Sequence, residues 1–375
     1  QAGHMFYTRR ERGDQMRLSH IDRIKAIAVL CMVEVHTAAI IPPAGMSMGD
    51  PAAFVAAAFG GMAAPLFVMI SGWAIYMSAS RRMMGGLTSA DEWASWMVPR
   101  VALLASCQIL VNLLLNTDRG GRFEVHTPGV LTLLAIAALL APVLVRLGME
   151  IRIFLMLVMI SSPMIMGDVS GTDWSWWDRV ASDGMSEWLS RLLWNGTYPA
   201  VPWMFYVLLG TLVYDLSDSP RTRERIIAIG LIATIITLLI SVREKVPWAL
   251  TEGDAVLTFF PASSSFLVVS GFFALLAHRI LEGEESSGGE PFGGDKLSFL
   301  EPLGRITLTV YVAHFAVLGL VAYAMQGEPR LELVPAFAVT IGHTLMWIPL
   351  AKAHQELIPE ISFEGLLRKL SQSTR

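Results

Sequence analysis

The stretch that decides the fold is residues 21–41, IDRIKAIAVLCMVEVHTAAII, an apolar run that begins with charges and carries Glu34 and His36 in its second half. A bilayer core about 30 Å thick is crossed by about 20 helical residues. The stretch therefore predicts one transmembrane helix. Because each helical residue turns the face by about 100°, Asp22, Lys25 and His36 share one stripe, whereas Glu34 points elsewhere. Ionisable groups inside a span are costly and mark substrate paths or catalytic centres.

The composition indicates a membrane protein. The 375 residues are 54% hydrophobic and only 16% charged, whereas soluble proteins carry about 25% charged residues. A net charge of -4 without a basic stripe gives nucleic-acid binding no support. Cys31 and Cys107 both lie in apolar segments, so no disulfide framework is indicated. Residues 1–4 are typical of a cloning remnant before Met5.

The apolar runs predict an all-α integral membrane bundle of about ten helices. We expect them at 23–42, 52–79, 93–116, 128–147, 151–168, 198–216, 225–242, 254–281, 303–325 and 334–352. With a cytoplasmic N-terminus, 20 basic residues fall on the cytoplasmic side and seven on the other, with Arg100 inside a span. This bias predicts that both termini are cytoplasmic. The expected domains are a cytoplasmic segment at 1–20, one transmembrane domain at 21–353 and a cytoplasmic tail at 354–375.

Few polar groups are expected at membrane depth, and two of them are imidazoles at similar depth. His36 lies about 20 Å from Arg23 along its helix, and His314 lies about 16 Å from Leu303 along a later one. Two such imidazoles on different helices can share a cavity, where a neutral His is a candidate general base. Tyr311 shares a helix face with His314 by its spacing.

Each of these residues also has a structural interpretation. The His residues can be satisfied core residues, and Glu34 can pair with a basic group on a neighbouring helix. Asp22 can form a capping box with Ser19, and Arg100 can extend towards the cytoplasmic surface. No zinc motif, serine-hydrolase elbow, phosphate-binding loop or dinucleotide fingerprint occurs in the sequence. We therefore predict no metal site.

Two loops differ from the rest in composition. Residues 169–197 are predicted to be external and contain five Trp residues, which indicates either an interfacial aromatic belt or a platform for a sugar ring. Residues 282–298 are acidic and Gly-rich, which predicts a flexible linker between two spans.

Six stretches, in order along the chain, resemble transmembrane acyltransferases of acyltransferase family three and of the heparan-α-glucosaminide N-acetyltransferase-like group. The opening helix of these families has an acidic residue, an Arg-Gly pair, an apolar run and a distal His or Asn, and Asp22, Lys25 and His36 fall on those positions. The other five stretches are APLFVMISGWAIYMS (64–78), VPRVALLASCQILVNLLL (98–115), HTPGVLTLLAI (126–136), YPAVPWMFYVLLGTLV (198–213) and LEPLGRITLTVYVAHFAVL (300–318).

The resemblance implies a multi-pass enzyme that moves an acyl group, usually acetyl from acetyl-CoA, to an acceptor within or across the membrane. The sequence departs from the pattern in three places. Lys25-Ala26 replaces Arg-Gly, which keeps the charge but loses the planar fork. Residues 37–64 contain no His, so the catalytic role falls on His36, as in family three. The doubled Arg motif is represented only by Arg81, Arg82 and Arg100.

We therefore expect an acyl-CoA-dependent O- or N-acyltransferase of a prokaryotic plasma membrane that modifies a sugar or glycoconjugate. The expected catalytic residues are His36, His314, Tyr311 and Glu34, with His36 acting as general base or as the carrier of a covalent acyl group. The expected acyl-CoA-binding residues are Asp22, Arg23, Lys25, Ser71, Arg100 and Arg305. The alternative is a proton-coupled transporter that uses His36, Glu34 and His314 as a relay. The sequence leaves the oligomeric state open, a homodimer included.

Overall fold

The computed structural model describes residues 18–45, 51–86, 89–285, 288–325 and 331–372. The predicted cloning remnant and most of the predicted N-terminal segment lie outside these residues. The regular structure is almost entirely helical, which confirms the all-α prediction. The long helices are α2 (Ser19–Ile40), α3 (Pro51–Met84), α4 (Ala90–Leu114), α5 (Val130–Leu144), α6 (Met149–Met166), α9 (Ala200–Asp215), α10 (Pro220–Glu244), α11 (Ser264–Glu282), α13 (Thr307–Met325) and α14 (Leu333–Leu357).

The remaining elements are short. They are η2 (Thr117–Arg119), η3 (Gly167–Ser170), α7 (Trp176–Val180), α8 (Gly184–Ser190), η4 (Arg191–Asn195), η6 (Gly294–Leu300), α12 (Glu301–Gly304) and α15 (Phe363–Gln372). Two parallel two-residue strands, β1 (Ala249–Leu250) and β2 (Leu257–Thr258), pair with Ala249 opposite Leu257. The predicted span at 254–281 is shorter as a helix, because Pro261 precedes Ser263, whose side chain caps α11 by accepting a bond from Phe266 N.

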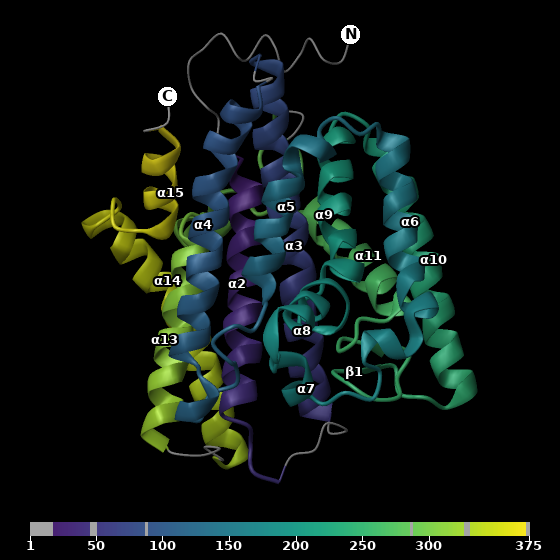
Figure 1. The fold of residues 1–375 in the computed structure, drawn as a ribbon, viewed down its shortest axis with the longest axis vertical. Coiled ribbons are helices and arrows are strands. Elements are labelled where there is room, and N and C mark those ends of the chain that lie inside the picture. Colours follow the sequence, from purple (N-terminus) through teal and green to yellow (C-terminus); the bar gives the residue numbers. More distant parts are fainter. Residues whose placement is uncertain (1–17, 46–50, 87–88, 286–287, 326–330, 373–375) are drawn as a thin grey trace.

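Helix α2 lies in the middle of the bundle, in contact with α3, α11, α12, α13 and α14 (Figure 1). Ile24, Val29 and Val33 are fully buried on it, and so are Ala26 and Ala28. Neighbours on all sides shield the helix from lipid, which allows it to carry four charged residues. The stretch 21–41, from which the membrane fold was predicted, therefore lies largely in the central helix of the bundle.

Seven helices of the described residues are long and apolar enough to cross a membrane, namely α3, α4, α6, α10, α11, α13 and α14. An eighth span results if α8 with η4 and the following α9, bent by 48°, form one crossing. Helix α5 is a shorter apolar helix, and α2 carries too much charge to qualify by composition. Each of the ten predicted ranges overlaps one of the long helices, but the number of ten spans stays a prediction.

Helices α3 and α9 cross at a close contact in which glycines face the partner backbone. A Cβ added at Gly72 would lie 2.7 Å from the backbone of Val207, so only Gly fits there. Gly210 faces the backbone of Met69 and Trp73 in the same crossing. Small residues of this kind allow membrane helices to approach closely without a break, and α3 is one continuous helix through Pro65.

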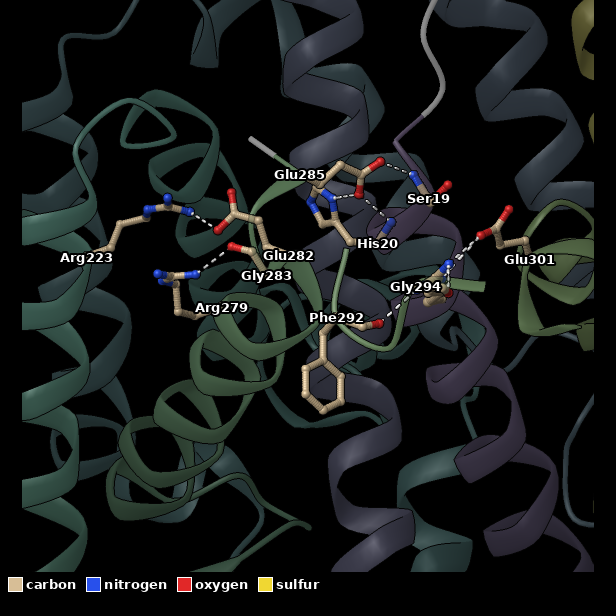
Figure 2. Close-up of polar contacts among 11 residues, drawn as sticks. Ser19, His20, Arg223, Arg279, Glu282, Gly283, Glu285, Phe292, Gly294 and Glu301 are labelled. Carbon is tan, nitrogen blue, oxygen red and sulfur yellow. Dashed lines mark hydrogen bonds and ion pairs between the residues drawn. The ribbon is translucent and has the colours of Figure 1, made fainter. Parts of the chain in front are cut away.

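The predicted flexible linker is an ordered anchor for α2 over its described residues, which corrects that expectation (Figure 2). The carboxylate of Glu285 accepts hydrogen bonds from Ser19 N at 2.7 Å, from His20 N at 2.9 Å and from His20 Nδ1 at 2.7 Å. Glu285 therefore satisfies the first amides of α2, and no capping bond from Ser19 forms, so the capping box is not present. Partial burial acts to raise the pKa of Glu285, but the bonds from His20 and Ser19 outweigh it and lower this pKa.

The Trp-rich segment 169–197 folds into η3, α7, α8 and η4 against the loop after α4. The indole N–H groups of Trp176 and Trp188 donate to the carbonyls of Arg122 and His126, each at 2.9 Å. Trp177 remains 50% exposed. The segment is thus a packed lobe in which some indoles hold the fold and others face outward.

Candidate active site

The two imidazoles predicted to share a cavity are hydrogen-bonded to each other. Nδ1 of His36 on α2 lies 2.9 Å from Nε2 of His314 on α13. The rings are parallel within 2°, with their centroids 5.2 Å apart. His314 is fully buried, whereas His36 is only half-buried. The pair therefore has an inner member locked by packing and an outer member with an accessible edge.

The hydrogen bonds determine which ring nitrogen of His36 can accept a proton when both rings are neutral. Nδ1 of His314 lies 3.2 Å from the carbonyl of Val310, and a carbonyl only accepts, so this nitrogen carries the proton. Nε2 of His314 is then the acceptor, and Nδ1 of His36 must donate to it. The lone pair of His36 is thus placed on Nε2, as expected for a general base oriented by a second residue.

Aromatic side chains connect this pair to the Trp-rich lobe. The ring centroid of Phe315 lies 4.6 Å from that of His36, and Phe123 lies 5.9 Å beyond Phe315. Trp176 follows at 5.8 Å from Phe123. Tyr311 packs edge-on against His314 at 5.6 Å, close to the position predicted from spacing. The site is therefore one aromatic layer away from the lobe.

Glu34 and His343 are not joined to the pair by a hydrogen bond among the described residues. Oε2 of Glu34 is buried without a hydrogen-bond partner, so the ion pair considered for it does not form in this part of the chain. His343 on α14 is bonded through Nδ1 to the hydroxyl of Thr37 at 2.8 Å. Thr37 itself donates to the carbonyl of Val33 at 2.6 Å. His343 thus fastens α14 to α2 beside the pair.

Three of the predicted acyl-CoA-binding residues form an ion-pair cluster at the start of α2. Arg23 is buried and donates to Glu301 at 2.9 and 3.2 Å and to the carbonyls of Phe292 and Gly294 (Figure 2). Arg305, 41% exposed, lies 3.8 Å from Asp22 and 3.7 Å from Glu301. Arg23 therefore has a structural role, and Arg305 is the more accessible cation of this cluster.

Arg100 lies in a second group of cations that is built on two buried indoles. Its guanidinium is 4.7 Å from the ring of Trp96, and that of Arg82 is 5.4 Å from the same ring. Arg146 lies 5.5 Å from the ring of Trp93, which packs edge-on against Trp96 at 5.7 Å. We call these five residues the Arg–Trp cluster.

The Arg–Trp cluster offers donors without acceptors. Nε1 of both Trp93 and Trp96 and Nη1 of Arg100 are buried without a hydrogen-bond partner among the described residues. The two indoles are only 3% and 4% exposed. Because buried donors without partners cost free energy, the arrangement favours an anion with several acceptor oxygens. Arg100 therefore faces an aromatic surface rather than extending freely to the rim.

The other predicted binding residues are placed less directly. Ser71 is half-buried on α3, one residue before the tight crossing with α9, and Lys25 is half-buried on α2. No group of His, Cys, Asp or Glu in the described ranges is arranged to hold a metal ion. Sequence reasoning missed Trp93, Trp96, Phe315 and Glu301, whose roles depend on neighbours that are distant along the chain.

One comparison with known proteins bears on this site. The family model for the acyltransferase domain of acyltransferase family three matches residues 18–347, from the residue before α2 to the middle of α14. No curated protein matches the chain. The match covers both imidazoles and the Arg–Trp cluster. It gives no support to the transporter alternative or to the heparan-α-glucosaminide-type specificity.

Proposed function

Because the chain belongs to acyltransferase family three and is an integral membrane protein, we propose that it transfers an acetyl group from acetyl-CoA to a hydroxyl or amino group of a sugar or glycoconjugate. The observation that carries the proposal is the His36–His314 hydrogen bond between α2 and α13, which orients a base. The Arg–Trp cluster supplies cations in the same bundle. A membrane acyltransferase needs both a base and a site for a polyanionic donor.

The donor phosphates are assigned to the Arg–Trp cluster, together with Arg305 and Lys25. Several unpartnered donors in one place match the oxygens of a diphosphate, and indole faces can stack on an adenine ring. Helix α4, which carries Arg100, packs against α13, which carries His314. A pantetheine arm is long and apolar enough to follow such helices towards His36.

The chemical step is direct transfer. Nε2 of His36 takes the proton from the acceptor O–H or N–H while the acceptor oxygen or nitrogen attacks the thioester carbonyl. The C–S bond then breaks, and the proton on Nε2 passes to the departing thiolate, so that His36 returns to its neutral state. A base positioned in this way contributes about 10²–10⁴-fold to the rate. His314 stabilises the imidazolium through its bond to Nδ1.

The acceptor is assigned to the side of the Trp-rich lobe. The aromatic contacts from His36 through Phe315 and Phe123 to Trp176 support this side, because sugar rings stack on aromatic faces. The exposed ring of Trp177 continues the aromatic surface to the outside. Donor and acceptor would then approach the imidazole pair from opposite ends of α2.

The experiment combines binding and turnover on purified full-length protein. Saturating acetyl-CoA is expected to raise the melting temperature of both wild type and His36→Ala, because ligand binding stabilises the folded state. Only wild type is expected to release CoA in the presence of an amino-sugar panel. Mass spectrometry without acceptor is expected to find no acetyl adduct on the protein. Full turnover by folded His36→Ala would refute the proposal.

A further inference from the structure

A crevice between α6, α9, α10 and α11 lies away from the imidazole pair. Its apolar wall is formed by residues that the site does not use. The space between its walls is about 440 Å³, the open solvent at its mouth included. The apolar side chains that line it include Met156, Leu209, Leu212, Leu216, Ile227 and Leu275.

The crevice is polar at one end and apolar along its depth. Arg223 opens α10, and His278 and Arg279 lie at the end of α11, so the three polar side chains that line the crevice come from the same end of the bundle. From Leu216 to Leu209, α9 lines the crevice over about 10 Å away from this end. The α10 and α11 walls therefore change from polar to apolar in the same direction, which matches an amphiphile with a headgroup and a chain.

The charges at the polar end are unequally satisfied. Arg223 is neutralised by the buried carboxylate of Glu282 at 2.6 Å. Arg279 donates to the carbonyl of Gly283 at 3.1 Å (Figure 2). Among the described residues it pairs with the acid Glu224, which is 3.9 Å away and exposed. The side chain of Arg279 is 34% exposed at the mouth. Arg279 is thus the more weakly paired and more accessible of the two cations.

His278 supplies an independent sign of a missing partner. It is 4% exposed and lines the crevice, and its Nε2 has no hydrogen-bond partner among the described residues. The ring packs edge-on against His20 at 5.2 Å, which fixes its orientation. A buried imidazole nitrogen without a partner is costly. A phosphate oxygen or phosphate hydroxyl would satisfy it.

The walls of the crevice belong to helices that present apolar side chains outward. Ile229, Ile232 and Leu239 on α10 are mostly exposed, and so are Phe154 and Leu157 on α6. In a bilayer these faces contact lipid chains, so a lipid is the amphiphile that reaches the crevice from the side.

We propose that the crevice between α6, α9, α10 and α11 binds one anionic phospholipid, with its phosphate against Arg279 and His278 and one acyl chain along Leu209, Leu212 and Ile227. The site is separate from the imidazole pair, and its occupation does not depend on the proposed transfer reaction.

The test uses native mass spectrometry of the full-length protein in detergent, titrated with dioleoyl phosphatidylglycerol or dioleoyl phosphatidylcholine. A single cation near the membrane surface predicts that the first phosphatidylglycerol binds about fivefold more tightly than phosphatidylcholine. Arg279→Gln is expected to abolish this preference, and Ile227→Trp is expected to weaken binding of both lipids by filling the crevice. The matched control is Arg243→Gln, because the Arg243 side chain is 86% exposed at the other end of α10. This variant is expected to leave the binding of both lipids unchanged.

Each other outcome overturns the proposal. A preference that survives in Arg279→Gln, with an unchanged melting temperature, would place the lipid elsewhere. An equal loss of the preference in Arg243→Gln would indicate nonspecific attraction between surface charge and anionic lipid. Competition by soluble glycerol 3-phosphate at the same concentration as the lipid would show a phosphate site without a chain-binding wall.

Discussion

The replacement of His314 by Phe tests the orientation of the imidazole pair. Phe keeps an aromatic ring between Tyr311 and Phe315 but removes the acceptor for Nδ1–H of His36. That hydrogen bond strengthens as His36 becomes cationic, and a bond to a charged group contributes about 1.5–3 kcal/mol. Its loss predicts a fall in CoA release of about 10- to 150-fold, since about 1.4 kcal/mol corresponds to a factor of ten.

The assay is acyl-CoA consumption by purified protein with a fixed acceptor, measured for four variants. His36→Ala is expected to lose about 10²–10⁴-fold. The double variant His36→Ala with His314→Phe is expected to lose no more turnover than His36→Ala alone, because the effects of residues that act as a unit do not add. His343→Phe is the matched control, since it removes the bond to Thr37 at a cost of about 1 kcal/mol in stability while the pair stays intact.

Three results would contradict this reasoning. Wild-type turnover in a folded His314→Phe protein would show that the bond between the rings does not orient the base. Multiplicative losses in the double variant would show that the two imidazoles act separately, as in a relay. An equal loss in His343→Phe would point to general damage of α2.

Three further predictions concern the scaffold. Gly72→Leu should lower the melting temperature in detergent by an overpacking cost of at least about 1–3 kcal/mol, because the side chain would meet the backbone of Val207; an unchanged value would refute the tight crossing. Glu285→Gln should destabilise the protein at pH 7 but less at pH 3. The pKa of Glu285 is lowered in the folded state, so the ionised carboxylate contributes stability above about pH 4.3, and this contribution is lost as the pH falls through the folded pKa. A destabilisation by Glu285→Gln that does not depend on pH would count against the anchor. Glu364→Gln should cost about 1.5–3 kcal/mol by weakening the bonds that α15 accepts from the first turn of α13, and no change in melting temperature would show that these bonds are dispensable.

The helices were predictable because their apolar runs are long, and this signal is local. The predicted start at residue 23 and the observed start of α2 at Ser19 differ because the extra turn is capped by Glu285, more than 260 residues away. The expected flexibility of residues 282–298 was wrong for a related reason. A Gly-rich, acidic composition predicts a flexible chain, but here the carbonyls of Phe292 and Gly294 accept hydrogen bonds from Arg23, and the carboxylate of Glu285 accepts one from His20.

The candidate site was predictable where helical spacing decided the geometry. Depth along two helices was enough to bring His36 and His314 together, and the i, i+3 spacing placed Tyr311 beside them. The surroundings of Arg100 were not predictable, because its contacts with Trp96 and Arg82 depend on how α3 and α4 pack. Charge alone could not show that Arg23 is paired with Glu301, whereas other cations keep donors for a ligand.

The position of His36 follows from how α2 is held at both ends. Its first turn is fixed by Glu285 and by the carbonyls that bind Arg23, and its last turns are fixed by His314 and by the bond from Thr37 to His343. A helix held in this way cannot rotate or slide without breaking hydrogen bonds at both ends. Because a base must stay within tenths of an ångström of the proton that it removes, the polar anchor at one end of α2 serves the imidazole at the other.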